Sequence, residues 1–243
     1  MKEYSCNRLF QNRHCQCSCS CFPSGKYLSE MMVLVNVSFT NIIIFRKGWF
    51  VNSMKRDLGV IDAVYPMPVL MVAAYDENGK VNVMNVAWGQ IADDDKIILF
   101  IGEGKRTWLN ILASKAFTVA LADEEHMDVA DFFGIASGNR INDKFERTGY
   151  HAVKSDKVNA PIIEEFPVVM ECELLEHLKD EYVSAIVGKI VNVKAEEKVL
   201  NEKGKVDVTK LHALMFDQFQ NGYYSTGEKV GQAWNAGKDL MKK

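Results

Sequence analysis

From Met54 onward, short hydrophobic runs alternate with polar turns, a spacing that indicates strands rather than long helices. Two of the runs alternate apolar and polar side chains with a period of two, which is typical of antiparallel strands with one buried face. The segments expected to form strands are 69–75, 80–87, 96–102, 116–122, 168–175 and 182–193.

Turn residues and helical spacing mark the connections between these strands. Asn78-Gly79 supplies the positive φ of a tight hairpin, and three aspartates at 93–95 mark a second turn. Residues 107–115 have the apolar spacing of a helix. Shorter helical or amphipathic segments are expected at 128–133, 141–148 and 209–219. So few helices exclude a doubly wound parallel sheet and predict an antiparallel barrel, whose edges a dimer interface can cover.

The first 53 residues differ from the rest in charge and cysteine content. They hold 6 bases against 2 acids, whereas residues 54–243 hold 23 bases against 30 acids. Five of the six cysteines fall in the first 21 residues, and a domain with one thiol is typical of the reducing cytoplasm. We therefore predict a domain boundary at Ser53–Met54. The net charge of -3 argues against a nucleic acid as partner.

Two interpretations of residues 1–53 remain open. The four cysteines between residues 15 and 21 lack the second downstream pair of a structural zinc site. The apolar segment 31–45 is too short to span a bilayer, and no other segment is long enough. Either Met54 is the true start and this Cys-rich, apolar extension has no function, or the extension binds a metal or associates with a membrane.

A glycine turn after an expected buried strand contains the first candidate site. Gly102-Glu103-Gly104 leads into Lys105, Arg106 and Thr107, and Thr107 is expected to cap the next helix. Free backbone N–H groups and the positive end of the helix dipole then lie beside two basic side chains. The pattern is neither a Walker A loop nor G-x-G-x-x-G. It predicts a phosphate-type anion site, or else an ordinary capped helix with two solvated bases.

Two asparagines interrupt the strand expected at 80–87, where asparagine is disfavoured. Asn82 and Asn85 lie inside it, and Trp88 and Gly89 follow. Amide side chains and a free strand backbone can hydrogen-bond the edge of a heterocycle, and an indole can cover its face. The alternative is an ordinary strand end with a tryptophan in the core.

The polar, glycine-containing segment 137–145 suits a loop that covers a ligand, or is a plain surface loop. The histidines are scattered and no H-E-x-x-H pattern occurs, so we expect no metal site. Cys172 is expected to be a buried strand thiol, with a position near a ligand as the alternative.

Together these segments resemble the flavin reductase-like family, in particular its flavoredoxin-like branch. The resemblance extends over residues 62–235, has no counterpart for residues 1–53, and depends on the order and spacing of several motifs. The motifs are Pro66-x-Pro68, D-x-N-G-K-x-N at 76–82, N-x-A-W-G at 85–89, I-G-x-x-K-R-T-x-x-N-I at 101–111, the segment from Ser137-Gly138 to Thr148-Gly149, and residues 223–237.

The resemblance implies an antiparallel Greek-key split β-barrel with peripheral short helices, formed by residues 54–243, that binds FMN near a homodimer interface. The phosphate is implied to lie at the anion site, and the isoalloxazine ring along the asparagine-containing segment. The residues implied to bind FMN are Asn82, Asn85, Val86, Ala87, Trp88, Gly89, Lys105, Arg106, Thr107 and Lys144.

Two departures from the family pattern affect the prediction. Met67 stands between the prolines where relatives often have arginine, which removes a possible cationic contact. Trp88-Gly89 replaces the small hydroxyl residues of many reductases of this fold, which favours tightly bound FMN over FMN as a diffusible substrate.

The resemblance implies an FMN-dependent oxidoreductase without catalytic side chains, because hydride transfer is the chemistry of the cofactor. Reducing equivalents pass from NAD(P)H through FMN to a flavin, a ferric complex or another acceptor, either a protein or a small molecule. One alternative is an FMN-containing electron carrier that does not oxidise NAD(P)H directly. Another is a barrel that binds a ligand other than flavin.

Overall fold

The computed structural model describes residues 55–242, and residues from Val60 onward form one unit. Everything predicted for residues 1–53, including the boundary at Ser53–Met54, lies outside the described residues. No helix among residues 55–242 is long and apolar enough to cross a membrane.

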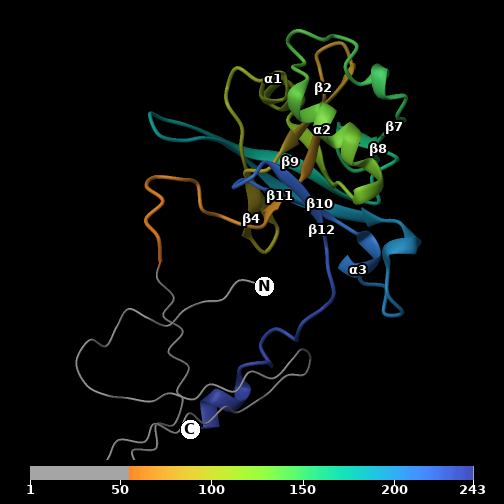
Figure 1. Cartoon of the computed structure of the whole chain (residues 1–243). Helices are drawn as coiled ribbons and strands as arrows, with labels where there is room; N and C mark the ends of the chain where they lie inside the picture. Colours follow the sequence, from red (N-terminus) through yellow and green to blue (C-terminus); the bar gives the residue numbers. More distant parts are fainter. Residues whose placement is uncertain (1–54, 243) are drawn as a thin grey trace, which may run out of the picture. The chain divides into compact units, whose positions relative to one another are not determined.

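A curled antiparallel sheet of seven strands forms the centre of this unit, in the order β3-β2-β6-β9-β10-β5-β4 (Figure 1). Its strands are β2 (Leu70–Tyr75), β3 (Val81–Val86), β4 (Gly89–Asp93), β5 (Lys96–Phe100), β6 (Ala116–Leu121), β9 (Val168–Lys179) and β10 (Ser184–Ala195). β3 and β4 lie at opposite edges of the sheet, yet only Ala87 and Trp88 separate them in the chain. Two residues cannot cross a flat sheet of seven strands, so the sheet curls into an incompletely closed barrel. The split β-barrel predicted from the sequence is confirmed.

The barrel interior holds one of the two main hydrophobic cores. Helix α1 (Arg106–Ser114) packs against β2, β3 and β6. Phe117 fills the interior, and a Cβ at Gly188 would collide with its ring, so only glycine fits there. Core residues on this side include Leu70, Val72, Leu99, Ile111, Phe117, Cys172 and Ile186.

The second core lies on the outer face of the same sheet. β2 contributes to both cores, because Leu70 and Val72 point inward while Met71 and Ala73 point outward. That double burial explains its unbroken apolar sequence. Helix α2 (Met127–Ile135) packs on β3, and the hairpin β7 (Ala152–Lys154) and β8 (Pro161–Ile163) packs beside β2 and β6. A small sheet is formed by β1 (Met67–Pro68), β11 (Leu214–Asp217) and β12 (Gly222–Ser225).

One strand was missed from the sequence, and the prediction of a helix at 141–148 was wrong. Residues 89–93 form β4, which shows no alternation because only Gly89 is buried. Residues 141–148 form turns and one short 3₁₀ segment instead of a helix. The segment 209–219 divides into helix α3 (Val208–Leu211) and strand β11, because His212 takes a left-handed conformation and ends the helix.

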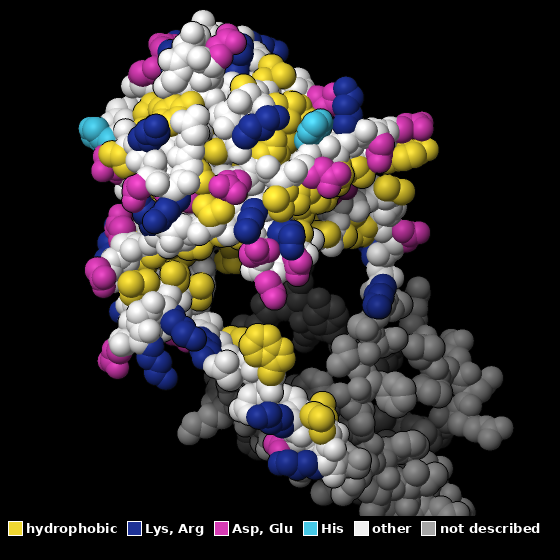
Figure 2. Space-filling view, turned by 180° about the vertical axis from the view of Figure 1, so that it is seen from behind, with side chains coloured by type: hydrophobic (Ala, Val, Ile, Leu, Met, Phe, Trp, Pro, Cys, Tyr) yellow, Lys and Arg dark blue, Asp and Glu magenta, His cyan; other side chains and the backbone are white. Residues whose placement is uncertain are grey.

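After β12 the chain continues as a C-terminal segment, residues 226–242, in which almost every side chain is exposed. Hydrophobic side chains stand out from it on the face seen in Figure 2. The large ones are Val230, Trp234, Leu240 and Met241.

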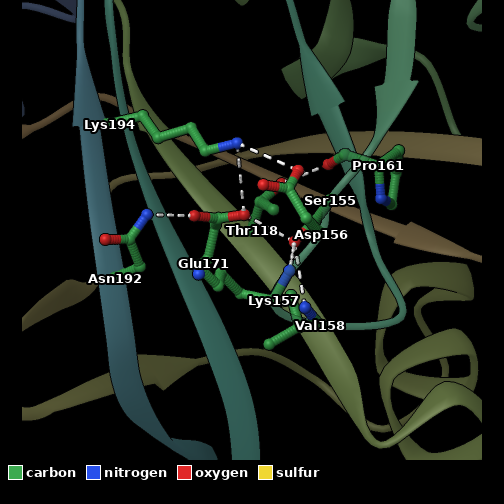
Figure 3. Close-up of polar contacts among 9 residues, drawn as sticks. All are labelled: Thr118, Ser155, Asp156, Lys157, Val158, Pro161, Glu171, Asn192 and Lys194. Atoms are coloured by element: carbon green, nitrogen blue, oxygen red, sulfur yellow. Dashed lines mark hydrogen bonds and ion pairs between the residues drawn. The ribbon is translucent and has the colours of Figure 1, made fainter.

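A buried carboxylate fastens one loop to the sheet (Figure 3). Glu171 of β9 is fully buried and accepts hydrogen bonds from Ser155 Oγ and Asn192 Nδ2, both at 2.5 Å. Ser155 Oγ in turn accepts the backbone N–H groups of Lys157 and Val158. Both carboxylate oxygens of Glu171 therefore have a hydrogen-bond partner, which a buried carboxylate requires.

Replacing Glu171 with alanine should lower the free energy of unfolding by about 3 kcal/mol, because Ser155 and Asn192 lose their acceptor inside the protein. Urea unfolding followed by circular dichroism measures the loss. Asp156→Ala is the control, since Asp156 pairs with Lys194 at the surface and its loss should leave the unfolding midpoint nearly unchanged. Equal effects of the two substitutions would contradict the role given to Glu171.

Candidate functional site

The amino end of α1 has no side-chain cap. The helix begins at Arg106 with Lys105 in the capping position, so the prediction that Thr107 caps it was wrong. Lys105 takes an extended conformation, and its ammonium group, which has no acceptor, cannot cap the first turn. Among the described residues, the N–H groups of Arg106, Thr107 and Trp108 have no acceptor. With no acidic residue in the first turn, these N–H groups are available to bind an anion.

Thr107 is held in place by an asparagine from the neighbouring strand. Its side chain is almost fully buried (1% exposed), and Thr107 Oγ1 accepts a hydrogen bond of 2.7 Å from Asn82 Nδ2. Because the oxygen is accepting from Asn82, the hydroxyl proton is free to be donated to an anion. Asn82 therefore contributes by orienting Thr107 beside the amino end of α1.

The loop 134–140 lies over this helix end. Asn139 Nδ2 donates to the carbonyl of Gly104 at 2.7 Å and joins the loop to the glycine turn. A Cβ at Gly138 would collide with the side-chain oxygen of Asn82 and lie 3.1 Å from Arg106 Cβ, so only glycine allows this approach. The space left between loop and helix is a cavity of about 100 Å³, room for a phosphate group but not for a whole nucleotide.

Lys144 is a buried cation in the wall of this cavity. Only 3% of its surface is exposed, and Lys144 Nζ donates to the carbonyl of Phe133 at 2.8 Å, at the end of α2. Burial, and then the positive charge of Lys105, lower the pKa of Lys144 to about 8. No carboxylate in residues 55–242 lies within ion-pair distance of it. A bound anion would supply the missing counter-charge.

The residues of the segment Asn85–Gly89 lie in three different environments. Successive residues of a strand point to opposite faces, and the chain leaves the strand after Val86. Asn85 points away from Asn82 and donates to the carbonyl of Ala130 at 3.0 Å. Val86 is buried in the barrel core. Ala87, Trp88 and Gly89 line a second, larger cavity of about 780 Å³ at the mouth of the barrel. Gly89 packs tightly there, since a Cβ would lie 2.7 Å from a terminal methyl group of Leu99 and 2.8 Å from one of Leu70, and both leucines would have to shift.

The structure therefore brings half of the predicted binding residues together directly. Asn82, Lys105, Arg106, Thr107 and Lys144 all line the small cavity. The others lie along the same strand and its turn. β3 is an edge strand, so the backbone groups on its outer side are free for a ligand within the described chain.

Other titratable groups lie apart from this cavity. Burial, followed by the charge of Glu171, raises the pKa of Cys172 to about 12, so its thiol is unreactive inside the barrel core. No group of His, Cys, Asp or Glu in the described part of the chain could hold a metal ion. Sequence reasoning included Tyr223 only as the start of a motif and missed its contact with Asp131, to which its hydroxyl donates at 3.0 Å; burial raises the pKa of Tyr223 to about 12. The two residues are too far apart in sequence to signal a contact.

Comparison with known proteins gives one family match and many structural neighbours. The model of the flavin reductase like domain matches residues 62–223. The flavoredoxin of Desulfovibrio vulgaris (Miyazaki F) is 31% identical, with a TM-score of 0.72, over 76% of this chain and 100% of that one. A flavoredoxin from Methanosarcina acetivorans is 25% identical, with a TM-score of 0.70, over 77% and 99%. An FMN-binding domain of a flavin reductases-like enzyme from Shewanella baltica OS155, at 18% identity, TM-score 0.61 and coverage of 68% and 88%, shares the fold.

Inorganic phosphate should bind the small cavity less tightly as the pH rises above about 8. Free Lys144 loses its proton there, whereas a bound dianion raises its pKa, so affinity should fall by up to about tenfold per pH unit. Calorimetric titration between pH 7 and 9.5 measures this slope. Lys144→Met should flatten it, and Lys154→Met, which removes an exposed lysine, should not. The same slope in wild type and Lys144→Met would contradict the assignment.

Proposed function

We propose that this chain, which belongs to the flavin reductase-like domain family, binds FMN and works as a flavin-dependent oxidoreductase. One observation carries the proposal. An uncapped helix end, an oriented threonine hydroxyl and a buried lysine without a carboxylate partner surround a cavity of phosphate size. These residues fit the phosphate of FMN, because its negative charge would pair with the buried lysine and the free N–H groups of the helix.

In this proposal the phosphate binds Lys105, Arg106, Thr107 and Lys144, and the isoalloxazine ring lies along the outer edge of β3 towards Trp88. Asn82 and Val86 are four residues apart, which is about 13 Å along a strand. In this proposal the ribityl chain bridges that distance between the phosphate and the ring. The free backbone groups of β3 would hydrogen-bond the polar edge of the ring. Asn85 holds β3 against α2 and leaves this edge accessible.

Bound FMN supplies the redox chemistry, accepting two electrons as hydride and passing them on. The residues of this chain orient the ring, exclude water from one of its faces and leave the other face open. Trp88, which is 51% exposed, borders that open face. We propose NAD(P)H as the reductant, and no side chain is needed to move a proton in the hydride step.

The second candidate function is an FMN-containing electron carrier that does not react with NAD(P)H. It is favoured by one feature of the sequence, since residues 54–243 have no G-x-G-x-x-G fingerprint for a dinucleotide. The third, a barrel for another ligand, has no specific observation in its favour.

We also propose that the protein is a homodimer in which the C-terminal segment packs on the partner subunit. The observation is the exposure of its apolar side chains, among them Trp234 at 94%. Sedimentation of the full chain beside a chain lacking residues 227–243 tests this. A dimer that persists without the segment would show that the subunits meet elsewhere.

The purified full chain should be yellow and carry about one FMN per chain. NADH or NADPH added without oxygen should then bleach the flavin absorption within seconds if the protein is an oxidoreductase. Flavin that stays oxidised but accepts electrons from dithionite would identify a carrier. A colourless protein that also takes up no added FMN would overturn the proposal.

Replacing Lys105 with alanine and Thr107 with valine together should weaken FMN binding by about 100-fold, because a charge and a charge-assisted hydrogen bond are lost. Fluorescence titration of the apoprotein measures the affinity. Lys189→Ala, which removes an exposed lysine of β10, is the control and should bind as the wild type does. Unchanged affinity in the double variant would refute the phosphate position.

A further inference from the structure

The larger cavity has a chemistry that the FMN phosphate site does not explain. It lies at the mouth of the barrel, beside the segment 61–68 and next to Ala87–Gly89. Its volume of about 780 Å³ falls in the range of small-molecule sites, which is about 300–1,000 Å³. Its apolar walls include Val64, Met67, Leu70, Trp88, Ile91, Phe100.

We propose that this cavity binds a neutral, quinone-like electron acceptor beside the flavin. That the occupant is an electron acceptor rests on the proposed function, in which the flavin ring lies beside Ala87, Trp88 and Gly89. These three residues also line the cavity. The cavity itself and the charge of its walls do not depend on FMN.

The charge of the walls selects for a neutral occupant. Among the described residues, no lysine, arginine or histidine lines the cavity. Its single carboxylate, Asp62, already accepts a hydrogen bond of 2.5 Å from Gln218 Nε2. A pyrophosphate or a free flavin phosphate would therefore enter without any counter-charge and beside a negative group.

Met67 contributes an uncharged side chain to the wall of the cavity. It is almost fully buried in β1 and its side chain lines the cavity. Its thioether carries no charge, so this part of the wall is uncharged. The soft thioether also suits contact with an aromatic ring.

Two polar features suit a planar carbonyl compound. The indole of Trp88 is half exposed at the border of the cavity and offers a face for stacking. Gln90 lines the same cavity, and its side-chain amide makes no hydrogen bond within the described residues, so it can donate to a carbonyl oxygen.

The reaction balances with the partners already proposed. A quinone takes up two electrons and two protons from fully reduced FMN and leaves as the hydroquinone, and FMN returns to its oxidised form. NAD(P)H then delivers a hydride, and water a proton, to reduce FMN again. No further oxidant or reductant is required.

The test uses the FMN-loaded full chain and menadione, a neutral quinone, as the probe. Ile91→Arg and Met67→Arg each put a cation into the cavity wall. Ile91 is more than half exposed, so its substitution spares the core if Met67→Arg fails to fold. Met127→Arg, on the exposed surface of α2 outside the cavity, is the matched control.

We expect calorimetry to show menadione binding to oxidised wild type and to Met127→Arg, and at least tenfold weaker binding to Ile91→Arg. Flavin content and the rate of flavin reduction by NAD(P)H should be the same in all three. Reoxidation by menadione should slow in Ile91→Arg, while reoxidation by the anion ferricyanide should not.

Absence of menadione binding to wild type, or equal binding in Ile91→Arg, would overturn the inference even if FMN is bound. A cavity sealed by a second subunit would give the first of these results. If the chain binds no FMN, the proposed function fails by itself. Titration of the flavin-free wild type, Ile91→Arg and Met127→Arg with menadione would still show whether the cavity binds a neutral quinone.

Discussion

The two-residue connection between β3 and β4 is the constraint on which the rest of the structure depends. Ala87 and Trp88 join strands at opposite edges of a seven-stranded sheet, so the sheet has to curl until these two edges come close at the turn, although they do not pair with each other. Gly89 lies directly after that turn, where a larger side chain would enter the space of Leu99 and Leu70. The bend leaves an edge strand open on one side of Trp88 and the mouth of the barrel on the other. The open edge of β3 and the cavity at the mouth of the barrel, the two regions proposed to bind ligands, therefore lie on either side of this turn.

Positive charge is in excess at the amino end of α1, and an anionic ligand would neutralise it. Lys144 is buried, lies near the positive charge of Lys105 and has a lowered pKa. A protein core rarely keeps a buried cation without a counter-charge unless function requires it. Glu171 shows the opposite case in the same molecule, because all of its contacts are satisfied by Ser155, Asn192 and Lys194. We propose that a ligand supplies the counter-charge of Lys144, whereas Glu171 holds a loop against the sheet.

Much of the fold could be predicted from the sequence, because apolar runs and turn residues act locally. Strand β4 could not be predicted, since four of its five residues are exposed and its pairing with β5 depends on closure of the barrel. The sequence predicted an anion site at Lys105–Thr107, and the structure places these residues together at one small cavity, while the binding of an anion there stays a prediction. It assigned the cap to Thr107 because threonine caps well in general, whereas here Asn82 engages the hydroxyl. The burial of Lys144 and the close approach of Gly138 depend on contacts distant in sequence, which no local pattern records.

Comparing the affinity of the full apoprotein for FMN with its affinity for riboflavin tests the phosphate site most directly. The two ligands share the ring and the ribityl chain and differ in the phosphate alone. If the amino end of α1 and Lys144 hold the phosphate, FMN should bind at least about 100-fold more tightly, because several charge-assisted hydrogen bonds are lost with riboflavin. Equal affinity for the two ligands would mean that the helix end and Lys144 do not bind the phosphate of FMN.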